Sequence, residues 1–355
     1  MGKTLKVGLI GLGGICRGPH MRCYNTMDNV EIVAICDILP EKIELFKKQF
    51  DMENIQSFTD YKELLEVEGL DFVDICTPNY LHSIIAVDAL NKGINVFTEK
   101  PDAVSVVEAT KMKEAAEKSG KHLMAMRNNR HRVTMQYLKK YIEEGKMGEI
   151  YCGRCGWQRR RGIPGKGGWF TTKEQSGGGP LIDLGVHYID LAIWLMGNPT
   201  PVSVSGSTYT KFAENNVSDS VHSAFGDKNA DGVFNVEDLA MGFIKFDNGA
   251  CLQIEFSWAS NVKAEKEFVE LRGTEAGCAF VNGELEIYTE KNGVLVDELP
   301  QLKDENGGHA TNIIHFTDVI ANGAKPDFEP VQGLNMIKIL EAIYKSAETG
   351  KEVIL

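Results

Sequence analysis

The first 126 residues alternate short apolar segments with stretches of helical pattern, and this alternation restricts the fold more than any other feature of the chain. The apolar segments are apolar at consecutive positions, as expected for strands covered on both faces. Such β-α repetition is typical of an α/β fold with a doubly wound parallel sheet. We expect strands at residues 5–10, 31–36, 72–76, 95–98 and 122–126, with helices ending near residue 27 and at 39–50, 80–92 and 104–119.

A glycine-rich turn directly follows the first expected strand. It matches the pattern G-x-G-x-x-G except at its last position, which is Cys16. The first glycine permits a tight turn, the second lets a pyrophosphate approach the backbone, and the next helix offers its N-terminal N–H groups. The cofactor contacts expected in this turn are Gly11, Gly13, Gly14 and Ile15.

An acidic residue, Asp37, ends the second expected strand. An acid at this place accepts hydrogen bonds from the adenosine ribose hydroxyls and repels a 2′-phosphate. The cofactor is therefore expected to be NAD rather than NADP. The alternative is a flavodoxin-like turn with an incidental aspartate.

Two later strand ends carry polar residues, at 76–79 (Cys-Thr-Pro-Asn) and 99–101 (Glu-Lys-Pro). Both fall on the carboxyl edge of the sheet, where ligands bind in open α/β folds. Lys100 could be a solvated charge, as most lysines are. At this edge it could instead polarise a substrate oxygen.

The second half of the chain has a different pattern. A helix is expected near residues 132–144, and two more near residues 310–322 and 332–349. Between them, alternating segments predict a mainly antiparallel sheet in an α+β domain. The predicted domains are residues 1–126 and 127–355, and the strands of the second are expected at 150–157, 202–210, 239–246, 250–257 and 267–272.

A glycine-rich entry at residues 177–180 precedes an apolar helix expected at 181–196. Its polar residues, Asp183, His187 and Asp190, are spaced by four and three and so share one helix face. Burial of such a stripe without partners is costly, which favours a cleft lining. The alternative is a core histidine bonded to Asp183. A metal site is disfavoured because two ligands at i and i+4 do not complete a shell.

A loop rich in arginine, glycine and aromatic residues follows the strand expected at 150–157. Trp169 could stack on a pyranose ring, and Arg159 could bind hydroxyls or a carboxylate. Alternatively, the run of arginines at 159–161 is solvated or lies at a subunit contact.

Residues 227–238 match the calcium-loop pattern of an EF-hand, with oxygen-bearing side chains at positions 1, 3, 5, 9 and 12 and glycine at position 6. The flanks argue against this interpretation. Residues 239–246 alternate as a strand, and residues 221–226 are too few for an entering helix.

Composition limits the possible partners. The formal net charge of -12 disfavours nucleic acid and anionic membrane surfaces. The N-terminus does not resemble a secretory signal, and no apolar run is long enough for a membrane helix, so a cytoplasmic location is expected. The cysteines lie mostly in apolar segments, and the pair Cys152 and Cys155 is expected to be structural rather than redox-active or zinc-binding.

Together, the glycine turn, Asp37, the two polar strand ends and the Gly-Gly, Asp, His helix resemble the glucose-fructose oxidoreductase, inositol dehydrogenase and MocA family. The resemblance implies a Rossmann domain, a second α/β domain with an open sheet, and dimers or tetramers. It also implies that Lys100 steadies the substrate oxygen, His187 exchanges the hydroxyl proton, and Asp183 orients the substrate. Further cofactor contacts are expected at Thr77, Pro78, Asn79, His82, Glu99 and Lys100.

The resulting hypothesis is hydride transfer between NAD and a hydroxyl carbon of a sugar, sugar derivative or inositol. The substrate contacts would be Lys100, Arg159, Trp169, Asp183 and His187, without a metal. One alternative is an NAD-dependent glycoside hydrolase or lyase with no net redox change. Another is a nucleotide-binding regulator without catalysis.

Overall fold

The chain forms two compact units in a computed structural model that describes residues 4–226, 228–302 and 308–355. The first unit is Met1–Asn128 with Asn306–Ile337, and the second is Asn129–Glu305 with Lys338–Leu355. The second predicted domain includes every residue after 126. The structure instead groups the helix at Gly308–Asn322 with the first unit.

The first unit contains a parallel sheet of six strands in the order β3-β2-β1-β4-β5-β6. The predicted parallel α/β sheet is thereby confirmed. The strand order reverses beside β1, and ligands bind at the carboxyl ends of the strands at such a point. The strands are β1 (Leu5–Ile10), β2 (Val30–Cys36), β3 (Gln56–Phe58), β4 (Phe72–Ile75), β5 (Asn95–Thr98) and β6 (Leu123–Ala125).

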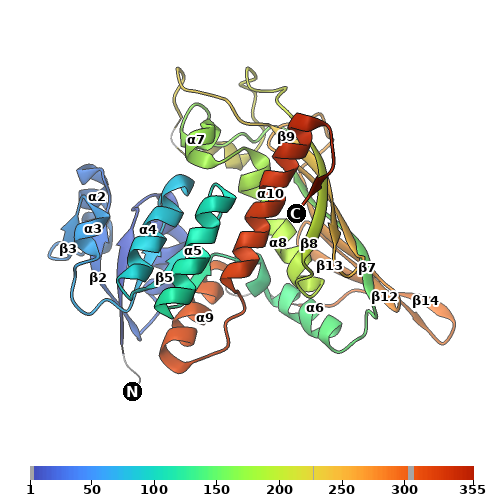
Figure 1. Ribbon diagram of the computed structural model, residues 1–355, viewed down its shortest axis with the longest axis horizontal. Coiled ribbons are helices and arrows are strands. Elements are labelled where there is room, and N and C mark those ends of the chain that lie inside the picture. Colours follow the sequence, from blue (N-terminus) through green and yellow to red (C-terminus); the bar gives the residue numbers. More distant parts are fainter. Residues whose placement is uncertain (1–3, 227, 303–307) are drawn as a thin grey trace. The chain divides into compact units, whose positions relative to one another are not determined.

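Helices cover this sheet, and Figure 1 shows α4 and α5 side by side against it. The chain leaves the glycine turn through a short π-helix, η1, before α1, rather than through one long α-helix. The helical elements are η1 (Cys16–His20), α1 (Met21–Tyr24), α2 (Pro40–Phe50), α3 (Tyr61–Leu64), α4 (Asn79–Asn91), α5 (Val106–Ser119) and α9 (Gly308–Asn322).

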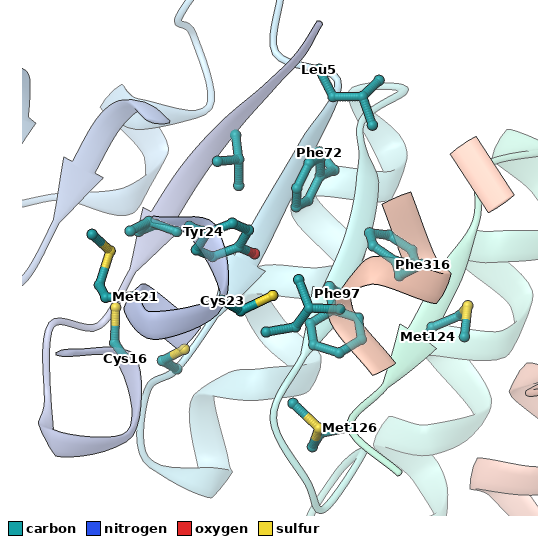
Figure 2. Close-up of a cluster of buried hydrophobic side chains, with 14 of the residues drawn as sticks. Leu5, Cys16, Met21, Cys23, Tyr24, Phe72, Phe97, Met124, Met126 and Phe316 are labelled. Carbon is teal, nitrogen blue, oxygen red and sulfur yellow. The ribbon is translucent and has the colours of Figure 1, made fainter. Parts of the chain in front are cut away.

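The late helix α9 completes the core of the first unit. Phe316 lies 5.1 Å from the ring of Phe97 and 5.4 Å from that of Phe72, measured between ring centroids. Figure 2 shows these rings in one cluster. Burial of one such side chain stabilises a fold by about 1.5–3 kcal/mol, which explains why α9 belongs to this unit.

The second unit contains a sheet of nine strands in the order β14-β13-β12-β11-β7-β10-β9-β8-β15. Its pairs are antiparallel except β7 with β10, so the predicted mainly antiparallel sheet is confirmed. The strands are β7 (Ile150–Gln158), β8 (Pro201–Tyr209), β9 (Leu239–Phe246), β10 (Cys251–Ser257), β11 (Lys266–Gly273), β12 (Ala276–Val281), β13 (Glu284–Lys291), β14 (Val294–Glu298) and β15 (Val353–Ile354).

The hairpins β12–β13 and β13–β14 are not among the predicted strands, although both carry a strong local pattern. Each has an Asn-Gly turn with positive φ, at residues 282–283 and 292–293. Asn-Gly between two strands favours the turn whose twist matches a hairpin.

One face of this sheet is covered by α8, which packs against β7 and β11 (Figure 1). The final helix, α10, contributes residues to both compact units. No helix among the described residues is long and apolar enough to span a bilayer. The helical elements are η2 (Asn128–His131), α6 (Val133–Glu143), η3 (Trp169–Thr171), α7 (Lys173–Ser176), η4 (Leu181–Gly185), α8 (Val186–Leu195), η5 (Val221–Ala224) and α10 (Pro330–Thr349).

Candidate active site

The glycine turn after β1 leaves its backbone open to a ligand. Gly11 has a φ of 92°, and a Cβ there would lie 2.7 Å from the carbonyl carbon of Cys76. A Cβ on Gly13 or Gly14 would meet no atom within 4 Å. Glycine is therefore required at position 11 by the fold, whereas the next two glycines keep space for a phosphate group. Cys16 points into the core and is buried.

Asp37 is fixed beside this turn. Its carboxylate accepts the N–H of Leu12 at 2.9 Å and that of Leu39 at 3.0 Å, and only 8% of the residue is exposed. These bonds hold the carboxylate at the end of β2, where a ribose is expected in this fold. The open turn and the fixed acid fit an NAD cofactor.

His82 braces two strand ends. Its ring nitrogens lie 2.7 Å from the carbonyl oxygen of Pro101 and 2.8 Å from that of Thr77, and the residue is buried. Burial lowers the pKa of His82, although both carbonyls oppose this effect. Its two nitrogens thus face the protein backbone, and direct contact with a cofactor stays a prediction.

The neighbouring residues present a mixed set of groups. Thr77 and Pro78 are half-buried, and Asn79 is buried at the start of α4. The Oγ1 atom of Thr77 is buried without a hydrogen-bond partner. A buried hydroxyl without a partner is costly, so Thr77 is suited to bind a polar group of the cofactor.

Glu99 and Lys100 follow β5. The Glu99 carboxylate accepts the N–H of Lys100 at 3.2 Å and lies 2.9 Å from Nε2 of His20. Burial opposes the charged form, but the hydrogen bond and charge of His20 outweigh burial and hold the pKa of Glu99 well below its ordinary value. Lys100 itself is half-buried. Glu99 is thus a buried carboxylate that accepts a backbone N–H of the lysine segment, and its contact with a cofactor stays a prediction.

The glycine-rich entry of the second unit is anchored by Glu237, which the sequence analysis considered only as part of the calcium loop. Its carboxylate accepts the N–H groups of Gly179 and Leu181, at 3.0 and 3.1 Å, and the hydroxyl of Tyr344 at 3.0 Å. A Cβ on Gly178 would overlap Tyr344. The glycines therefore let Glu237 and Tyr344 approach the start of the helix.

Asp183 and His187 are the partly exposed residues in the segment 181–190, whose other residues are buried. Asp183 lies in the π-helical η4, and His187 lies in the first turn of α8. Trp258 donates its indole N–H to Asp183 at 3.0 Å. Two polar groups thus emerge together from an apolar helix, and π-helical turns of this kind are frequent at functional sites.

Asp190 does not share this exposure, and its predicted place in a cleft lining is wrong. It accepts two hydrogen bonds from Arg130, from Nε at 2.7 Å and from Nη2 at 2.6 Å, and both side chains are buried. A bidentate pair satisfies the carboxylate inside the protein. Asp190 has a structural role.

The run of three arginines divides among different environments. Arg159 is buried, with its guanidinium 4.6 Å from the centroid of the Trp157 ring. Burial lowers the pKa of Arg159, and the nearby charges of Asp183 and Glu265 oppose this effect. Arg160 is exposed, and Arg161 donates to a backbone carbonyl at 2.7 Å. Arg159 alone combines burial with the electrostatic influence of Asp183.

Glu265 and His222 join this group, although no pattern in the sequence singles them out. Trp157 donates its indole N–H to Glu265 at 2.7 Å, and Nε2 of His222 lies 3.4 Å from the same carboxylate. Burial raises the pKa of Glu265, but its hydrogen bonds and the charge of Arg159 lower it to about 2. Trp169, in contrast, stacks on Phe170 at 3.9 Å, so one face of its ring is covered.

The calcium-loop residues that the structure describes face different partners. Asn235 accepts the N–H of Lys173, and Asp238 accepts N–H groups from residues 211 and 212. The strand β9 begins at residue 239, as the flanks predict. Asp227 lies outside the described residues. The described part of this loop is therefore held by hydrogen bonds to residues 173, 211 and 212.

These features define an NAD-binding oxidoreductase built from a Rossmann unit and a second sheet unit. Residues 5–126 match the model described as "Oxidoreductase family, NAD-binding Rossmann fold", and residues 135–279 match that of the GFO/IDH/MocA C-terminal domain. The chain belongs to the GFO/IDH/MocA oxidoreductase family, as the resemblance predicts.

Several relatives match most of the chain. D-glucoside 3-dehydrogenase of Escherichia coli (strain K12) is 31% identical over 350 residues, which cover 98% of this chain and 97% of that protein. Levoglucosan dehydrogenase of Pseudarthrobacter phenanthrenivorans is 30% identical over 293 residues, covering 78% and 74%. A solved structure of levoglucosan dehydrogenase with NADH and levoglucosan has a TM-score of 0.85 and 25% identity, with 99% of each chain covered.

Proposed function

We propose that this protein is an NAD-dependent dehydrogenase that oxidises or reduces a hydroxyl carbon of a sugar, glycoside or polyol. The observation that carries the proposal is the shared partial exposure of Asp183 and His187 in the segment 181–190, whose other residues are buried. Two relatives named as dehydrogenases of D-glucosides and levoglucosan support a sugar as substrate.

The proposed reaction divides between nicotinamide and side chains. Bound NAD supplies the acceptor for the hydride that leaves the carbinol carbon. His187 takes the hydroxyl proton, and the ammonium of Lys100 stabilises the charge that develops on the oxygen. Asp183 orients the substrate and His187. In the reverse direction His187 returns the proton.

Substrate contacts are proposed for Arg159 and Trp169 as well. For Arg159 this role is supported by its burial and by the nearby charge of Asp183, which favours the charged guanidinium. The ring of Trp169, which stacks on Phe170, would pack its other face on the sugar ring. For the cofactor, we propose the contacts Gly11, Gly13, Gly14, Ile15, Asp37, Thr77, Pro78, Asn79, His82, Glu99 and Lys100.

The test is a screen of methyl D-glucosides, levoglucosan, aldoses, sugar acids and inositols with NAD and with NADP, followed by absorbance of NADH. His187→Ala should lower turnover by about 10² to 10⁴ and leave NAD affinity nearly unchanged. His122→Ala, at an exposed histidine of the first unit, is the matched control. Normal turnover in His187→Ala would remove His187 from the mechanism.

Two outcomes would redirect the proposal. Hydrolysis or elimination of a glycoside without accumulation of NADH would replace it with the alternative that has no net redox change. Preference for NADP in the native protein would contradict the role of Asp37, and Asp37→Ala should weaken NAD binding if that role is right.

We further propose a cytoplasmic homodimer or homotetramer that contacts its copies through the second unit's sheet. Exposed apolar side chains on β9 and β13 support this assembly: Met241, Phe243 and Tyr288 are about two-fifths exposed. Light scattering of the native protein and of Phe243→Asp tests it. A native monomer would contradict the proposal.

A further inference from the structure

His20 lies between two buried carboxylates in the first unit. Its Nδ1 is 2.7 Å from Oδ2 of Asp74, its Nε2 is 2.9 Å from Oε1 of Glu99, and the ring is fully buried. Tyr24 donates its hydroxyl to the same Asp74 oxygen at 2.8 Å. Figure 2 shows Tyr24 within the core cluster of this unit. Two acidic side chains thus share one imidazole.

Each ring nitrogen faces a carboxylate oxygen, so a ring that donates from both nitrogens satisfies both partners. This arrangement favours the imidazolium cation over the neutral ring. Burial alone would favour the neutral ring, but the charges and hydrogen bonds of Asp74 and Glu99 raise the pKa of His20 well above its ordinary value. The cation offsets carboxylate charge that would otherwise be buried without compensation.

The network joins three elements: η1 after the glycine turn, strand β4, and strand β5, which precedes Lys100. His20 ends η1, which follows the glycine turn, and Asp74 lies in β4. Glu99 follows β5 and uses its other oxygen to accept the N–H of Lys100. A chain of hydrogen bonds therefore runs from the helix after the glycine turn to the backbone of Lys100.

Metal binding is the competing interpretation. His20, Asp74 and Cys76 offer ligand atoms within 4.8 Å of one another. The short contacts of both ring nitrogens with carboxylate oxygens are instead those of charge-assisted hydrogen bonds. Burial also raises the pKa of the Cys76 thiol, which disfavours the thiolate that a metal would need.

We propose that His20 is a positioning residue that fixes Glu99, and through it the backbone of Lys100, relative to the helix after the glycine turn. The inference rests on the proposed function of Lys100. It assigns no contact with substrate to His20. Loss of the bond to Glu99 would let the Lys100 segment shift, and a shift of about 1 Å can cost about 10² in rate.

Two conservative substitutions separate the bonds of His20. The amide nitrogen of His20→Asn matches Nδ1 and can still reach Asp74 but not Glu99. That of His20→Gln matches Nε2 and can still reach Glu99. We expect His20→Asn to slow single-turnover hydride transfer by about 10- to 100-fold and His20→Gln to stay within about fivefold of the native protein. Tyr24→Phe removes a bond to Asp74 but leaves the bond between His20 and Glu99. Its rate of hydride transfer should stay within about threefold of the native rate.

The decisive comparison repeats His20→Asn in a Lys100→Ala background, with NAD and the sugar identified by the screen above. Positioning through Lys100 predicts that His20→Asn causes no further loss there, while NAD affinity is unchanged. If His20→Asn does not fold, Glu99→Gln replaces it in the same cycle, and positioning through Lys100 again predicts no further loss of rate in the Lys100→Ala background.

Three outcomes would overturn the inference. One is an equal loss from His20→Asn with and without Lys100, and another is equal damage from His20→Asn and His20→Gln in proportion to lost thermal stability. The third is one equivalent of zinc or iron in the native protein that His20→Asn removes. Normal turnover in Lys100→Ala would instead contradict the proposed function itself, so the two failures are distinguishable.

Discussion

The two units support their proposed functional side chains, Lys100 and Asp183, in opposite ways. In the first unit a buried cation, His20, holds two carboxylates, and one of them holds Lys100. In the second unit a buried carboxylate, Glu237, holds neutral amides and a hydroxyl at the start of the helix that carries Asp183. The first support depends on a balance of charges, whereas the second depends on the number of hydrogen bonds.

Both supports act on a similar piece of backbone. In each unit a glycine-rich turn leads into a π-helical segment, η1 or η4. His20, the last residue of η1, contacts two carboxylates, and Glu237 accepts N–H groups from Gly179 and from Leu181, the first residue of η4. Because the two turns are alike, the difference in charge chemistry can be tested by substitutions that remove one interaction at a time.

The largest loss of stability is expected at the buried ion pair of the second unit, Arg130 with Asp190. Asp190→Asn leaves Arg130 as a buried cation without its carboxylate, and breaking a buried pair in this way costs about 3–5 kcal/mol. Denaturant unfolding measures the loss. The double variant Arg130→Met with Asp190→Leu should recover most of it, because an apolar pair leaves no buried charge. A double variant as unstable as Asp190→Asn would contradict this account.

A smaller effect is expected at the neutral support. Glu237→Ala removes the acceptor of two backbone N–H groups and the Tyr344 hydroxyl, so the free energy of unfolding should fall by roughly 3 kcal/mol. Tyr344→Phe removes one bond and should cost about 1 kcal/mol. Turnover should fall with Glu237→Ala because the helix start carrying Asp183 loosens. Unchanged stability in Glu237→Ala would show that water replaces the carboxylate.

The smallest effect is a difference in pH dependence. The raised pKa of His20 means that the folded state binds more protons than the unfolded state above the ordinary value of 6.5. Its contribution to stability is therefore complete below that pH and is lost as pH rises toward the raised pKa. The midpoint temperature of thermal unfolding, measured from about pH 6 upward, should decrease more steeply with pH in the native protein than in His20→Gln. Parallel curves would contradict the charged state of His20.

For Glu237 the direction of the pH effect is the same but the window is lower. Burial raises the pKa of Glu237 above its ordinary value of 4.5, although its hydrogen bonds oppose this. The folded state therefore binds this proton more tightly than the unfolded state does, and stability is lost as pH rises from 4.5 toward the raised value. The two supports can thus be separated on a single pH axis.

The sequence marks the candidate groups for a ligand but not the residues that hold those groups in place. The glycine turn and Asp37 are readable because their backbone geometry demands particular residue types at fixed spacing. Family resemblance supplies the roles of Lys100 and His187, which local periodicity alone cannot distinguish from structural residues.

The supporting residues are not predictable because their partners are distant in sequence. Glu237 lies 58 residues from Gly179, and Arg130 lies 60 residues from Asp190. Nothing local marks an arginine as the partner of one particular carboxylate. The same limit applies to α9, which is predicted as a helix but packs with the first unit because Phe316 completes its core.

The most direct test of the account follows a single hydrogen atom. A sugar that the screen identifies is deuterated at the carbon to be oxidised and incubated with the native protein and NAD. Mass spectrometry of the nicotinamide should find one deuterium for each sugar oxidised, and His187→Ala should slow its appearance without changing that ratio. Deuterium retained in the product or lost to water, without labelled NADH, would contradict a dehydrogenase.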